Sequence, residues 1–183
     1  FSRDGTSLLV TTGNTFNASA WGGGDAVIRI AKGPTFSNAS ADYYAPSNWV
    51  SLDNTDEDMG THVLVTAPAA TPSSLVLGFG KDGNVYATDH AKMGGVGGEL
   101  SMLNAASGAP PGAVAPSPTA AGTFVAFRVD GGSPNGCPSG GGGNMGVVKI
   151  AGSPPKAQMA WCASEGDLSL PIVSMTDASG AGA

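Results

Sequence analysis

The sequence carries little charge, and few of its charges are positive. Only 12% of the 183 residues are charged, with 8 lysines and arginines against 14 acidic residues, for a formal net charge of −6. Because nucleic-acid surfaces need clustered positive charge, we expect no nucleic-acid partner. No apolar run reaches the roughly 18 residues that a transmembrane helix needs, so we also expect no membrane span.

Cysteine is scarce as well. Cys137 and Cys162 form no CxxC motif and have no histidine partner, which argues against a metal site or a redox centre. Two alternatives stay open, a disulfide between them or two buried free thiols. A disulfide, together with the bias toward Thr, Ser, Gly and Asn, favours an extracytoplasmic protein that is periplasmic or secreted.

Glycine and proline are abundant, with 29 and 13 residues, just below the level typical of disordered chains. The chain is nevertheless 41% hydrophobic, and its apolar residues form short β-branched runs between Gly, Pro, Ser and Asn clusters. Many short strands separated by turns give this pattern, so the sequence predicts an all-β fold rather than a disordered chain.

The predicted strands recur in a fixed order. Three strands that each follow a Gly-rich approach begin at Val27, Val85 and Val147, which are 58 and 62 residues apart. A further short run follows each of them, and a strongly β-prone run precedes each. The full set of predicted strands is 8–12, 27–30, 42–45, 62–66, 75–79, 85–88, 100–103, 113–117, 124–128, 147–150, 158–161 and 171–175.

Repeated four-stranded antiparallel meanders are typical of β-propeller blades. A β-sandwich also contains short alternating strands, but it does not by itself repeat the same order three times. We therefore expect one partial propeller domain over residues 1–183, with blades at about 5–46, 62–104 and 112–163 and the start of another at 170–177. Because both ends of the chain would cut through blades, we also expect exposed strand edges that favour self-association.

Three places in the sequence could carry chemistry. Asn14 follows a strand and offers an amide oxygen to a hard cation, although Gly13–Asn14 could equally be a turn. The segment 48–60 holds four carboxylates within six residues, including Asp53 and Asp56. These carboxylates could bind Ca²⁺ or supply a general base, or they could belong to a solvated acidic loop. Lys81 stands beside the Asp82–Gly83 hairpin turn, where it could also be an ordinary exposed lysine.

The order of these motifs resembles that of the pyrroloquinoline-quinone (PQQ) dehydrogenases, which are eight-bladed quinoprotein propellers, and of the wider group of PQQ-repeat proteins. The resemblance covers about residues 5–104 and is carried by Thr12-Gly13-Asn14, Gly24-Asp25, the loop with Trp49 and Asp53, and the hairpin 80–89. Beyond residue 104 only the rhythm of the strands supports it.

The resemblance implies roles for four residues. Asn14 corresponds to a Ca²⁺ ligand beneath the quinone, with Asp53 as a second candidate ligand, and Lys81 corresponds to the basic residue that contacts the quinone carbonyls. The general base of the family directly follows the tryptophan, where this chain has Val50. Asp53, or Asp56 as the second choice, would take over that role here.

Two functions follow from the resemblance. The first is an oxidoreductase that uses PQQ and Ca²⁺ to oxidise a small alcohol or sugar. The second, suggested by Val50, is a non-catalytic PQQ-repeat propeller that serves as an extracytoplasmic binding or scaffold module.

Overall fold

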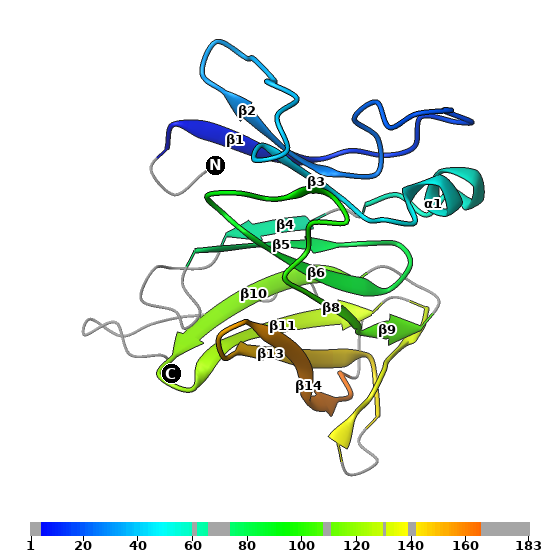
Figure 1. Ribbon diagram of the computed structural model, residues 1–183. Helices are drawn as coiled ribbons and strands as arrows, with labels where there is room; N and C mark the ends of the chain where they lie inside the picture. Colours follow the sequence, from blue (N-terminus) through cyan, green and yellow to red (C-terminus); the bar gives the residue numbers. More distant parts are fainter. Residues whose placement is uncertain are drawn as a thin grey trace.

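The computed structural model describes residues 5–59, 62–65, 74–107, 111–129, 131–138 and 142–165. Over these segments the protein is built from β-strands with one short helix, in agreement with the predicted all-β class. Three four-stranded sheets follow one another along the chain, and Figure 1 shows them stacked in that order, from the blue first sheet to the yellow and brown third sheet.

Within each sheet, the strands lie side by side in the order in which they occur along the chain. Neighbouring strands are antiparallel, except for one pair in the first sheet that is described below. The first sheet contains β1 (Ser7–Thr11), β2 (Val27–Ala31), β3 (Tyr43–Ala45) and β7 (Gly95–Val96). The second contains β4 (His62–Val65), β5 (Leu75–Phe79), β6 (Asn84–Asp89) and β8 (Ser101–Asn104). The third contains β10 (Pro111–Thr119), β11 (Gly122–Val129), β13 (Met145–Ala151) and β14 (Lys156–Ala163).

The strand positions predicted between residues 7 and 163 are therefore confirmed, whereas the run 171–175 lies outside the described residues. The sequence predicts three strands within residues 5–46, at 8–12, 27–30 and 42–45, whereas the first sheet has four. Its fourth strand, β7, belongs to the connection between β6 and β8 and pairs parallel to β3. A second small pairing joins β9 (Ala106–Ser107) to β12 (Ser133–Pro134).

The hydrophobic core consists of two clusters that lie between the sheets. One joins the second and third sheets through fully buried side chains such as Leu77, Phe79 and Phe127. The other joins the first and second sheets, where the rings of Tyr44 on β3 and Tyr86 on β6 lie 5.5 Å apart. Each sheet thus buries apolar side chains against its neighbour, as stacked layers require.

The acidic segment after the first sheet contains a helix, where the sequence analysis considered a loop. Helix α1 spans Trp49–Thr55 and ends at Asp56, which has the left-handed conformation with φ of 59°. Its buried residues are Trp49, Leu52 and Asp53, spaced so that they share one face of the helix. The helix therefore turns Asp53 inward together with its apolar residues, toward the turn that follows β1.

Cys137 and Cys162 form a disulfide, so the alternative of two free thiols is wrong. The bond closes a loop with a sequence separation of 25 and ties the segment after β12 to β14. A loop of this length restricts the unfolded chain enough to stabilise the folded state by about 3 kcal/mol.

We therefore expect the double variant C137S/C162S to lose about 3 kcal/mol of unfolding free energy, measured by urea denaturation at pH 7. The wild-type protein under reducing conditions should show the same loss. Equal stability of the oxidised wild-type protein and the double variant would contradict this expectation.

Candidate functional site

Three segments that are far apart in the sequence meet at one end of the first two sheets. They are the turn after β1 with Asn14, the segment 53–58 that includes the end of α1, and Lys81 in the turn between β5 and β6. We call Asn14, Asp53, Asp56, Asp58 and Lys81 the polar cluster. It contains every residue that the sequence analysis selected, together with Asp58.

Asn14 is held by the acidic segment through both its backbone and its side chain. Its backbone N–H donates to Asp58 Oδ1 over 2.9 Å, and its Nδ2 donates to Asp56 Oδ1 over 3.0 Å. Nδ2 also lies 3.4 Å from the carbonyl oxygen of Asp53. Since the amide nitrogen makes these contacts, the Oδ1 atom of Asn14 is the end that remains for a ligand.

Asp58 connects the turn of Asn14 to the turn of Lys81. While Oδ1 accepts from Asn14, Oδ2 forms an ion pair with the Lys81 ammonium. The Lys81 backbone N–H also donates to the carbonyl oxygen of Asp58 over 3.0 Å. The hydrogen bond with Asp58 is the main reason why the pKa of Lys81 is raised above its ordinary value. Lys81 is therefore a firmly protonated cation.

Lys81 also contacts Asp56, and so the two candidate residues Asn14 and Lys81 share both carboxylates. The ammonium lies 3.2 Å from the Asp56 carbonyl oxygen and 3.7 Å from its Oδ2 atom. The Asp56 side chain is 70% exposed, which leaves its carboxylate open to solvent.

Asp53 is occupied by the turn that follows Asn14. Its Oδ1 accepts hydrogen bonds from the backbone N–H groups of Thr15 and Phe16 and from the Thr15 hydroxyl, over 2.6 to 3.0 Å. Its Oδ2 accepts from the Asn17 N–H over 2.8 Å. Burial alone would raise the pKa of Asp53, but these hydrogen bonds outweigh it and hold the pKa below its ordinary value. Asp53 is thus a poor proton acceptor that anchors a turn.

Val50, which directly follows Trp49, lies on the outer side of α1. Its side chain is 49% exposed, while the neighbouring Trp49 is buried. Position 50 is thus part of the solvent-facing surface of the helix.

Asp25 is a site residue that the sequence analysis did not select. It is completely buried, and neither of its carboxylate oxygens has a hydrogen-bond partner. Burial raises its pKa to about 6, and the negative charges of Asp53 and Asp58 add to that effect while Lys81 opposes it. A signal was present in the sequence, because Asp25 is the only charged residue between Asp4 and Arg29.

The approach of β1 to β2 at this site depends on a missing side chain at Gly24. A Cβ atom there would lie 2.6 Å from the Thr15 methyl carbon and 2.9 Å from the Gly13 carbonyl oxygen. Gly22, in the same glycine run, has its nearest such atom only at 4.0 Å.

We expect Gly24→Ala to destabilise the protein by about 1–3 kcal/mol, because backbone must move to admit the methyl group. Gly22→Ala is the matched control and should change the unfolding free energy by less than about 0.5 kcal/mol. Denaturant unfolding of the two variants measures the difference. Equal stability of Gly24→Ala and Gly22→Ala would show that the turn of Thr15 can move without cost.

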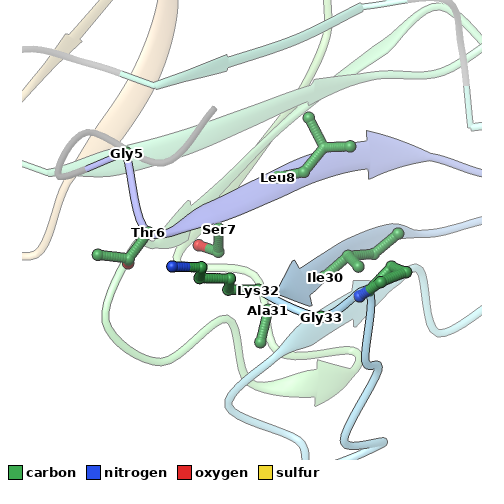
Figure 2. A pocket seen from close by; sticks show the side chains of 9 residues that line it. Gly5, Thr6, Ser7, Leu8, Ile30, Ala31, Lys32 and Gly33 are labelled. Carbon is green, nitrogen blue, oxygen red and sulfur yellow. The ribbon is translucent and has the colours of Figure 1, made fainter.

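A separate hollow of about 310 Å³ opens at the other end of the first sheet, where β1 begins and β2 ends. Figure 2 shows Leu8 and Ile30 on these neighbouring strands together with Lys32. The lining is mostly apolar and includes no acidic residue, so the hollow has none of the groups that make up the polar cluster.

The chain matches no known protein family, and neither curated proteins nor solved structures gave a match. Nowhere in the described segments do three or more His, Cys, Asp or Glu side chains form a group that could hold a metal ion. Those segments also contain no helix with the length and apolar character needed to cross a membrane.

Proposed function

We propose that the protein is part of a PQQ-dependent, dehydrogenase-like propeller that oxidises an alcohol or a sugar, with the polar cluster as its cofactor site. The observation that carries the proposal is that Asn14 and Lys81 both contact Asp56 and Asp58. The resemblance assigns Asn14 to the cation and Lys81 to the quinone, so these two residues must lie close together if the assignment is right.

The arrangement of the sheets supports the propeller part of the proposal. The second and third sheets are four-stranded antiparallel meanders, and all three sheets lie face to face in chain order (Figure 1). Blades of a propeller have this internal order and pack on one another in this way.

The residues of the cluster fit a divalent cation and an anionic quinone. Oδ1 of Asn14 is a hard oxygen ligand of the kind that Ca²⁺ prefers. In the described segments the buried Asp25 carboxylate has no hydrogen-bond partner, and the Lys81 ammonium contacts the carboxylates of Asp56 and Asp58. The ammonium of Lys81 would face the carboxylates and carbonyls of the quinone. When bound, PQQ supplies the acceptor for the hydride of the substrate.

Of the two candidate bases, the geometry favours Asp56. The carboxylate of Asp53 already accepts hydrogen bonds on both oxygens, whereas that of Asp56 is largely open to solvent. In this proposal Asp56 takes the hydroxyl proton of the substrate, and Asp53 holds the turn that carries Asn14.

The test is to incubate the protein with PQQ and Ca²⁺, remove free quinone and measure the retained quinone absorbance. Reduction of an artificial dye is then followed with a panel of primary alcohols and aldoses. We expect retained quinone and PQQ-dependent turnover. Lys81→Gln should weaken quinone binding at least tenfold, about 1.4 kcal/mol, while the exposed Lys92→Gln should not change it.

A second candidate function is a non-catalytic PQQ-repeat propeller that acts as an extracytoplasmic binding or scaffold module. The occupied carboxylate of Asp53 and the exposed Val50 favour it, since neither position offers a free base. The disulfide is compatible with the extracytoplasmic location that both functions share. If the protein retains no quinone when PQQ and Ca²⁺ are supplied, the dehydrogenase is excluded and this function remains.

A further inference from the structure

Asp25 is a buried carboxylate without a hydrogen-bond partner in the described segments, and the proposed function assigns it no role as a ligand. Its side chain is 0% exposed, and both carboxylate oxygens lack a hydrogen-bond donor. A buried carboxylate is costly unless it is paired, hydrogen-bonded or bound to a metal. A cation bound beside Asp25 would compensate this charge.

The backbone fixes Asp25 next to the turn of Asn14. Asp25 N–H donates to the carbonyl oxygen of Gly13 over 3.1 Å, and Asp25 has a positive φ of 47°. Non-glycine residues rarely adopt this conformation, and it is often found at functional sites. Asp25 is thus held in an uncommon conformation beside the residue that precedes Asn14.

The charges around Asp25 select a cation as the ligand. The groups that act on its carboxylate are the carboxylates of Asp53, Asp58 and Asp56 and the ammonium of Lys81. With Asp25 itself, these side chains carry four negative charges and one positive charge. Lys81 is already paired with Asp58, so it does not neutralise Asp25.

We propose that Asp25 is a ligand of a hard divalent cation of the Ca²⁺ class, bound beneath the polar cluster together with the Oδ1 atom of Asn14. The remaining ligands would be backbone carbonyls and water, since the described segments hold no group of three or more His, Cys, Asp or Glu side chains that could bind a metal ion. The inference deepens the cation site of the proposed function, but it requires no quinone. It adds a carboxylate from the turn before β2 to which the resemblance gives no role.

Terbium luminescence is a suitable probe, because Tb³⁺ occupies Ca²⁺ sites and is excited through a nearby indole. Trp21 is such an indole, since its Nε1 donates to the carbonyl oxygen of Gly24 over 2.8 Å. We expect saturable Tb³⁺ emission that Ca²⁺ displaces, and a melting temperature that rises with added Ca²⁺. Asp25→Asn should weaken Ca²⁺ binding at least tenfold, and it removes a buried charge, so the variant should fold.

Asp89→Asn is the matched control, since Asp89 is an exposed carboxylate at the other end of β6, and it should bind Ca²⁺ like the wild-type protein. Equal Ca²⁺ affinity of Asp25→Asn and wild type, or no saturable binding up to about 10 mM Ca²⁺, would overturn the inference. If Ca²⁺ binding requires Asp25 but the protein retains no quinone, the inference is supported and the dehydrogenase proposal is refuted. If the Asp25→Asn variant retains PQQ in the presence of Ca²⁺ as well as the wild-type protein does, the dehydrogenase proposal is supported and the role of Asp25 is refuted.

Discussion

Replacing Asp53 with asparagine should lower the melting temperature by roughly 5–10 °C, a larger effect than for any other single carboxylate of the polar cluster. Asp53 accepts hydrogen bonds from three consecutive backbone N–H groups, those of Thr15, Phe16 and Asn17. An asparagine keeps one acceptor oxygen and turns an NH₂ group toward the remaining donors, so buried donors lose their partner.

The turn that Asp53 holds cannot easily keep its shape without it. Phe16 and Asn17 have positive φ values of 51° and 65°, a conformation that costs free energy for residues other than glycine. The hydrogen bonds to Asp53 offset that cost. We therefore expect faster amide hydrogen exchange at residues 15–17 in the Asp53→Asn variant.

Asp56→Asn is the matched control, because the Asp56 side chain is largely exposed and makes only peripheral contacts. Its melting temperature should stay within about 2 °C of wild type. The pair also separates the two roles considered for Asp53. A variant Asp53→Asn that melts like wild type but loses dye reduction would identify Asp53 as a base, against the anchoring role argued above.

Asp25 should make the cation-free protein less stable as the pH rises from about 4 to about 6. The folded-state pKa of Asp25 is raised from 3.8 to about 6, so between these values the folded protein holds a proton that the unfolded chain has released. The unfolding free energy therefore falls with increasing pH across this window. Above the window, Asp25 causes no further change in the unfolding free energy.

The Asp25→Asn variant removes this titration. Relative to wild type, the variant should gain about 1–2 kcal/mol of unfolding free energy between pH 4 and pH 7, a figure reduced from the full shift because solvent screens part of the cluster. The measurement is urea unfolding of both proteins at a series of pH values with a chelator present. A stability difference between the two proteins that does not change with pH would contradict this expectation. Added Ca²⁺ should remove the stability advantage of the variant at pH 7.

Much of the fold could be predicted from local sequence. The run Leu75–Phe79 is continuous, apolar and rich in β-formers, and Asp82–Gly83 marks the turn after it, where Gly83 has a φ of 78°. Signals of this kind depend on residues that are neighbours in the chain. They locate strands and turns without information on what packs against them.

Helix α1 and the role of Asp58 could not be obtained in this way. The buried face of α1 ends in Asp53, and a carboxylate at a buried position conflicts with the apolar spacing that normally reveals a helix. Asp58 looked like one acid among four, and only the fold brings it between Asn14 and Lys81. The burial of Asp25 likewise depends on residues that are distant in sequence.

The pairing of β7 with β3 has a consequence for how the protein unfolds. The connection between β6 and β8 crosses to the first sheet, where the N–H groups of Met93 and Gly97 donate to the carbonyl oxygens of Ala41 and Ala45. A repeat array whose units touch only through side chains can lose its units one after another. Here the backbone of the second unit completes the sheet of the first, so the two should melt in a single cooperative transition.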